Sequence, residues 1–139
     1  MSIKETIIQL MNEWAPVDTA ESWDNVGLQL DTRQDISTVD IVLELNTHTW
    51  PLVRENRPEF IISHHPFIFN PIVAIGYQSW QDQVLRDLIA NDVGLYVAHT
   101  NLDKADNAVS MALYETFDLS FVAIDGKESF YDGYGVKVA

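Results

Sequence analysis

Two adjacent imidazoles, His64 and His65, are the side chains in this sequence best suited to chemistry, and they stand between the apolar residues 60–62 and Pro66. Neighbouring side chains on a regular strand point to opposite faces, but past the end of a strand both rings can turn toward one site. Pro66 also restricts His65 to an extended conformation. Because neutral imidazole is the commonest metal ligand, the pair predicts a metal site. On this spacing alone, two ordinary polar residues on a turn are the plainer interpretation.

A second polar cluster, residues 99–103, follows the apolar segment 93–98. Its carboxylate, Asp103, is positioned to join His64 and His65 as an oxygen ligand, and His99 is expected to face the same crevice. Two imidazoles, a carboxylate and water suit Zn, Fe, Mn or Ni better than Mg or Ca. The competing interpretation is that Asp103 caps a helix and that His99 is a hydrogen-bonded structural residue.

The segment 21–29, ESWDNVGLQ, is the third candidate. A structural role is favoured here on local grounds. Trp23 and Val26 are expected to fill the core, and Asp24 and Asn25 are expected to form an Asx turn.

The elements that must position these clusters alternate between helix and strand. Spacing and cap residues predict helices over about 3–14, 79–91 and 106–117, and a short helix capped by Thr47 or Thr49 that ends before Pro58. Apolar runs predict strands at 28–30, 39–45, 60–62 and 93–98, with two further short strands at 121–124 and 135–138. On the inner face of the helix at 3–14 we expect Ile3, Ile7, Leu10, Met11 and Trp14. On the inner face of the helix at 79–91 we expect Trp80, Val84, Leu85, Leu88 and Ile89.

This alternation indicates an α/β fold, with a mostly parallel sheet flanked by helices in one domain over residues 1–139. Ligands bind such sheets beyond the carboxyl ends of the strands. Both histidine clusters stand at those ends.

Composition narrows the functional classes. Eight Lys and Arg against 21 Asp and Glu give a formal net charge of −13, which argues against binding nucleic acid or an anionic membrane and attracts cations. The absence of Cys excludes disulfides, thiolate zinc sites and iron–sulfur clusters. The sequence shows no signal-peptide core, membrane-spanning run, glycine-rich phosphate loop or serine nucleophile elbow, so we expect a cytoplasmic protein.

Three segments together resemble the dinuclear metal-centre hexameric family, also called NIF-three-like. They are ESWDNVGLQ at 21–29, IISHHPFIF at 61–69 and AHTNLD at 98–103. Many members of this family carry the name GTP cyclohydrolase I type 2 homologue. The resemblance covers roughly residues 3 to 118, the front part of the family fold.

The resemblance implies an α/β domain that assembles into a toroidal hexamer and holds two divalent metals per subunit. The family ligands fall on His64, His65 and Asp103, and His99 would line the same pocket as a proton donor or acceptor. Metal-dependent hydrolysis of a small substrate is the expected activity, with a nucleotide as one candidate substrate. A divalent ion lowers the pKa of water and polarises a carbonyl or phosphoryl oxygen. The alternative is a non-catalytic metal-binding or interaction subunit.

The sequence departs from the family in two places. Family ligand sets are completed by a His followed four residues later by a Glu, whereas here no His follows His99 and the later Glu residues, Glu115 and Glu128, lie in no such motif. The usual glycine after the third motif is replaced by the stretch 104–107. Either the chain is a truncated or split member, or another chain supplies the remaining ligands. A homo-oligomer is expected; the resemblance implies a hexamer, and a dimer or trimer stays open.

Overall fold

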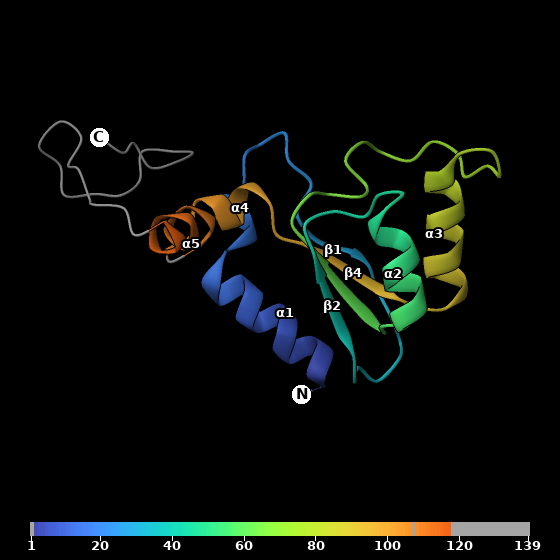
Figure 1. Ribbon diagram of the computed structural model, residues 1–139, viewed down its shortest axis with the longest axis horizontal. Coiled ribbons are helices and arrows are strands. Elements are labelled where there is room, and N and C mark those ends of the chain that lie inside the picture. The colour runs from blue at the N-terminus through green and yellow to red at the C-terminus, as the bar shows by residue number, and fades with distance from the viewer. Residues whose placement is uncertain (1, 107, 118–139) are drawn as a thin grey trace, which may run out of the picture.

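A four-stranded sheet in the order β1-β4-β3-β2 organises the computed structural model, which describes residues 2–106 and 108–117 (Figure 1). The strands are β1 (Gly27–Leu30), β2 (Val39–Val42), β3 (Phe60–Ser63) and β4 (Gly94–Val97). The helices are α1 (Ile3–Trp14), α2 (Thr49–Asn56), α3 (Trp80–Ala90), α4 (Thr100–Asp103) and α5 (Val109–Thr116), with a 3-10 turn, η1, at Val17–Thr19. The strands expected at 121–124 and 135–138 lie outside the described residues.

The sheet is mostly parallel, as expected. Strands β2, β3 and β4 run parallel, and β1 joins β4 in the antiparallel sense. In the register of β3 with β4, Ser63 pairs with Val97, so the last residues of the two strands lie side by side. The backbone therefore leaves β3 toward His64 and leaves β4 toward His99 at the same edge of the sheet.

Helices cover both faces of the sheet, with α1 on one face and α2 and α3 on the other (Figure 1). The α2 and α3 side is packed by buried aliphatic side chains: Leu45, Val53, Ile61, Val84, Leu88, Leu95 and Val97. On the α1 side, buried Phe60 and Tyr96 meet partly buried Ile7, Ile8 and Met11. Gly94 allows this packing, because a Cβ there would lie 2.4 Å from the Phe60 ring.

Sequence periodicity placed too many side chains in the core. In α1 the capping box of Ser2 and Glu5 is present, but Ile3, Leu10 and Trp14 are 58%, 58% and 48% exposed. In α3, Ile89 is 55% exposed. Each of these helices contacts the sheet along a narrow stripe, and apolar residues at the edge of the helical pattern fall outside that stripe.

Several boundaries also differ from the prediction. Strand β2 ends at Val42, not at residue 45, and α5 begins at Val109, not near 106. The short helix α4 was not predicted. The N-cap of α2 is His48, so neither threonine has the role expected of it, and the Oδ1 of Asn46 accepts from the backbone N–H groups of His48 and Thr49.

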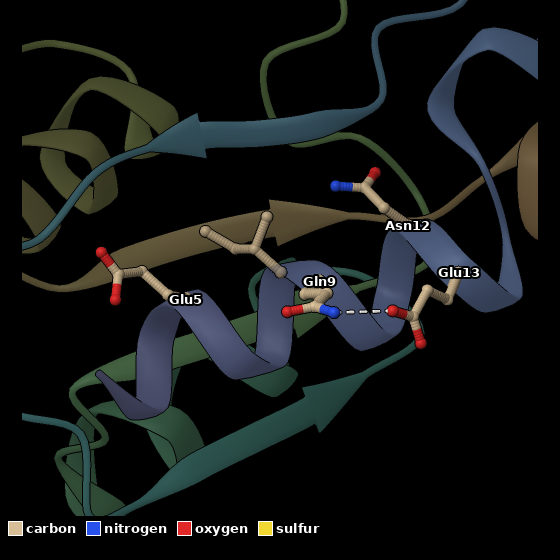
Figure 2. A pocket seen from close by; sticks show the side chains of 5 residues that line it. Glu5, Gln9, Asn12 and Glu13 are labelled. Carbon is tan, nitrogen blue, oxygen red and sulfur yellow. Dashed lines mark hydrogen bonds between the residues drawn. The ribbon is translucent and has the colours of Figure 1, made fainter. Parts of the chain in front are cut away.

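An open hollow of about 650 Å³ lies along α1, lined by Glu5, Ile8, Gln9, Asn12 and Glu13 (Figure 2). Within it Gln9 donates a hydrogen bond to Glu13 at 2.7 Å. All five residues belong to one helix and none is a histidine, so this hollow does not coincide with the polar clusters at the strand ends. Among the described residues, no helix is long and apolar enough to span a bilayer.

Candidate metal centre

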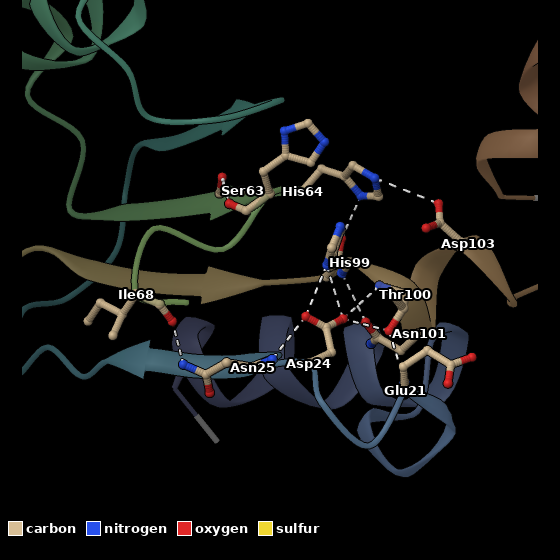
Figure 3. Close-up of polar contacts among 12 residues, drawn as sticks. Glu21, Asp24, Asn25, Ser63, His64, Ile68, His99, Thr100, Asn101 and Asp103 are labelled. Atoms are coloured by element: carbon tan, nitrogen blue, oxygen red, sulfur yellow. Dashed lines mark hydrogen bonds and ion pairs between the residues drawn. The ribbon is translucent and has the colours of Figure 1, made fainter. Parts of the chain in front are cut away.

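Three imidazoles meet at the carboxyl edge of the sheet. The His64 ring lies 5.1 Å from the His65 ring and 5.3 Å from the His99 ring, centroid to centroid, and His65 and His99 are 5.7 Å apart. Taking one nitrogen from each ring, the potential ligand atoms all lie within 4.8 Å of one another. The strand-end pair and the histidine that follows the next strand therefore form one cluster, as Figure 3 illustrates for His64 and His99.

The backbone beyond β3 explains how neighbouring histidines come to share a site. The ladder to the β2 side continues past the strand, since His64 N donates to Val42 O at 3.1 Å and His65 N donates to Leu43 O at 2.8 Å. The Ser63 hydroxyl donates to the carbonyl of His65 at 2.8 Å, which closes a local turn. The chain is thus held in place where its side chains no longer alternate between faces.

The Nδ1 atom of each imidazole lies within hydrogen-bond distance of an oxygen. His64 Nδ1 lies 2.8 Å from the carbonyl of Ala98, His65 Nδ1 lies 3.1 Å from Glu44, and His99 Nδ1 lies 3.0 Å from both oxygens of Asp24. A carbonyl or an ionised carboxylate can only accept, so Nδ1 carries the proton in all three rings. In the neutral rings the lone pair is then on Nε2, the arrangement in which a histidine is prepared to bind a metal.

Asp103, from α4, is the third member of the predicted ligand set, with His64 and His65, and it lies outside the group of three imidazoles whose potential ligand atoms are within 4.8 Å of one another. Its Oδ1 lies 3.6 Å from His64 Nε2, with both side chains about one-fifth exposed. At that separation no hydrogen bond joins the two atoms. A lone pair on Nε2 and a carboxylate oxygen repel each other, and a proton or a metal ion shared between them removes that repulsion.

The charges around the rings favour a cation. Asp24, Glu44 and Asp103 surround the three imidazoles, and no Lys or Arg of the described residues forms an ion pair with any of these carboxylates. Burial raises the pKa of Asp24, but hydrogen bonds from His99 and Thr100 outweigh burial and hold that pKa below its ordinary value. Hydrogen bonds from Asn46 and His65 likewise lower the pKa of Glu44. Both carboxylates are therefore ionised at neutral pH.

Asp24 and Glu44 are the functional neighbours that sequence reasoning missed. Asp24 was expected to form a local turn, and its Oδ1 does accept from the backbone N–H of Asn25, but its other partners, His99 and Thr100, lie 75 and 76 residues away. Its place in the segment 21–29 was the one available signal. Trp23 is 59% exposed instead of buried, and its ring lies 6.4 Å from His99 and 6.2 Å from Phe69.

Comparison with known proteins gives a family match over most of the chain. The model of the Duf34/NIF3 (NGG1p interacting factor 3) family matches residues 1–136. NIF3-like protein 1 of Drosophila melanogaster is 36% identical over 107 residues, which is 75% of this chain and 36% of that protein. The GTP cyclohydrolase 1 type 2 homolog of Bacillus subtilis is 32% identical over 117 residues, covering 84% of this chain and 31% of the relative.

Solved structures agree with the fold. A Bacillus cereus protein related to NIF3 superposes with a TM-score of 0.76 at 32% identity, over 84% of this chain and 32% of its own. Reduced HcgD from Methanocaldococcus jannaschii superposes with a TM-score of 0.75, also at 32% identity, over 96% of this chain and 52% of that one. This chain therefore spans about a third of the length of the two curated relatives and at most about half of these two structures.

Proposed function

We propose that this chain, which belongs to the Duf34/NIF3 family, binds a divalent transition metal ion between His64, His65 and Asp103 and supports hydrolysis of a small substrate. The observation that carries the proposal is the state of the three imidazoles. Each ring donates Nδ1–H to an oxygen, and the potential ligand atoms of the three rings lie within 4.8 Å of one another. Imidazole nitrogens grouped in this way beside a carboxylate are a ligand set for Zn, Fe, Mn or Ni.

The residues present fit such an ion. The Nδ1 of His64 bonds the carbonyl of Ala98 and the Nδ1 of His65 bonds Glu44, and these contacts orient both rings without a metal ion. Asp103 Oδ1 lies 3.6 Å from His64 Nε2, and an ion bound between the two atoms would gain a charged oxygen ligand and remove their mutual repulsion. When bound, the ion would polarise a substrate oxygen and lower the pKa of a neighbouring water.

His99 is the residue we assign to proton transfer. Its Nδ1–H is directed at Asp24, so Nε2 is the nitrogen that can take a proton from water or pass one to a leaving group. The ring centroid of His99 lies 5.3 Å from that of His64, which places this base beside the proposed metal ligands. The chain itself supplies one general base and one three-residue ligand set.

Among the described residues one group of three histidines, His64, His65 and His99, is placed to hold an ion, and this supports a site for one ion. The names of the relatives point to a nucleotide such as GTP as a substrate to test. Assembly into a homo-oligomer belongs to the same proposal, and exposed apolar side chains such as Val73, at 99%, and Ile41, at 79%, are consistent with subunit contacts. The cytoplasmic location and the single domain over 1–139 stay predictions.

Metal binding is tested by titration of dialysed protein with Zn2+, Mn2+, Fe2+ and Ni2+ under calorimetry, with metal analysis of the purified protein. We expect one ion per chain, and we expect His64→Gln, His65→Gln and Asp103→Asn each to weaken binding by at least about tenfold. His48→Gln is the matched control, because His48 lies at the start of α2 outside the cluster. Equal metal binding by His48→Gln and His64→Gln protein would refute the site.

The hydrolytic part needs a separate test. Metal-loaded protein is incubated with GTP and the products are separated by chromatography. We expect turnover that His99→Gln abolishes while the variant still binds metal. Metal binding without turnover on GTP or other small phosphate esters would leave the non-catalytic alternative, a metal-binding or interaction subunit.

A further inference from the structure

The contact between Asp24 and His99 is more extensively built than the metal proposal requires. The Asp24 side chain is 0% exposed. Both of its oxygens lie 3.0 Å from His99 Nδ1. Figure 3 shows the carboxylate at the side of the His99 ring away from His64. The loop after η1 thus places the buried carboxylate of Asp24 beside the Nδ1 of His99, the residue that follows β4 and Ala98.

Four donors converge on this one carboxylate. Oδ2 accepts from the backbone N–H of Thr100 at 3.1 Å and from the Thr100 hydroxyl at 2.5 Å. Oδ1 accepts from the backbone N–H of Asn25 at 2.9 Å, and the His99 ring completes the set. The Thr100 hydroxyl in turn accepts from the backbone N–H of Glu21 at 3.0 Å.

The backbone of His99 is fixed as well. Its N–H donates to Asn101 Oδ1 at 2.9 Å, and the Asn101 side chain, itself 0% exposed, donates to the carbonyl of Ala15 at 2.7 Å. The main chain and the ring nitrogen of His99 are therefore held by separate groups. The ring has little freedom to rotate or to exchange its two nitrogens.

We propose that Asp24 is a positioning residue that locks His99 in the Nδ1–H tautomer, so that Nε2 is permanently the basic nitrogen on the side of the His64 and His65 rings. An aspartate is required because all four groups around it are donors in this arrangement. An asparagine has one acceptor oxygen and would turn its NH2 group toward some of those donors.

The tautomer claim stands on the contacts above, whereas the use of Nε2 in proton transfer rests on the proposed function. The two are separated by reading the tautomer directly in metal-free protein. Long-range proton–nitrogen correlation NMR of nitrogen-15-labelled protein distinguishes the tautomers of a neutral imidazole. The spectra are recorded at successively higher pH until the nitrogen shifts stop changing, so that the tautomer is read in the neutral ring.

In wild-type protein we expect the His99 signals, assigned by their loss in His99→Gln, to show the Nδ1–H form. In Asp24→Asn we expect the Nε2–H form or a mixture of the two. Asp31→Asn is the control, since Asp31 also accepts hydrogen bonds, from Lys4 and from the Thr32 backbone, but lies outside the cluster. Thr100→Val, which removes one donor and keeps the carboxylate, should leave the Nδ1–H form in place.

An Nε2–H form in the wild-type protein overturns the inference even if Asp24→Asn does not fold, and so does an unchanged Nδ1–H form in a folded Asp24→Asn protein. A Zn2+ titration of the wild type runs beside these spectra. A protein that shows the lock but takes up no metal would refute the proposed function and keep the inference. A protein that binds zinc with His99 in the other tautomer would do the reverse.

Discussion

His99 and His65 each direct Nδ1 at a carboxylate, yet the two sides of the cluster are built differently. On the His99 side the Asp24 side chain is 0% exposed and accepts from four donors. On the His65 side the Glu44 side chain is 44% exposed, His65 is 45% exposed, and the other side chain donating to Glu44 is Asn46. One contact is part of the fold and the other lies at the surface.

The difference separates two tasks that a histidine site has to perform. A buried, fully bonded carboxylate holds a ring in one orientation and stabilises the folded chain at the same time. An exposed carboxylate exchanges its partners with water at little cost, so it can orient a ring without contributing much to folding. We therefore expect changes on the Asp24 side to affect stability and site together, and changes on the Glu44 side to affect the site alone.

The largest effect is expected from Asp24→Asn. Asparagine replaces one carboxylate oxygen by an NH2 group and sets it against donors for which the described residues show no other acceptor, and this should lower the free energy of unfolding by roughly 2–3 kcal/mol at neutral pH. Urea unfolding followed by circular dichroism measures the change. Asp31→Asn is the control. The Asp31 side chain forms an ion pair with Lys4 but is 67% exposed, so this change should affect stability far less.

The same pair has a defined pH dependence. The pKa of Asp24 in the folded chain lies below its ordinary value of 3.8, so its stabilising contribution is complete above that value and is lost as the pH falls through the folded pKa. Asparagine does not titrate, and the gap between wild type and Asp24→Asn should therefore narrow as the pH is lowered below 3.8. A gap that stays constant, or widens, in acid would show that the charge of Asp24 is not what stabilises the fold.

The sequence predicted that the strand-end histidines come together, because the pattern needed for that prediction is local. Apolar runs mark β3 and β4, parallel pairing brings their carboxyl ends together, and residues that follow each strand must then meet. His64, His65, His99 and Asp103 could be grouped on that argument. The interpretation of the polar segment at 99–103 did not foresee that Thr100–Asp103 forms the short helix α4.

Asp24 and Glu44 could not be found in the same way. Asp24 reaches His99 across 75 residues and Glu44 reaches His65 across 21, and no local pattern records such contacts. Exposure of Trp14 and Ile89 was missed for a related reason, because the width of the stripe that a helix buries depends on the tertiary contact and not on its own periodicity. Local patterns predicted the candidate ligands, and the tertiary structure shows which groups hold their rings.

A smaller effect is expected from Thr100→Val, which keeps the shape of a side chain that is 2% exposed and removes its hydroxyl. Asp24 loses one of its four donors, and the backbone N–H of Glu21 loses the acceptor that the hydroxyl provides. Unfolding free energy should fall by roughly 1–2 kcal/mol, less than for Asp24→Asn because the carboxylate stays ionised and bonded. Thr19→Val is the control, since that exposed hydroxyl bonds only the nearby carbonyl of Pro16.

The smallest change in folding is expected from Glu44→Gln. An exposed glutamine can still accept from His65 Nδ1 through its own oxygen, and water can satisfy Asn46, so the denaturant midpoint should stay close to that of the wild type. Glu59→Gln is the control for zinc binding, because Glu59 accepts from Ser37 and Thr38 outside the cluster. Zn2+ affinity should fall nonetheless, by no more than about tenfold, because the ring keeps its partner but loses the charge behind it. If Glu44→Gln unfolds as readily as Asp24→Asn, the two sides of the cluster are not distinct and the separation of orientation from stability is wrong. If its zinc affinity equals that of Glu59→Gln, orientation of His65 comes from the backbone after β3, where His65 N donates to Leu43 O, and not from the carboxylate.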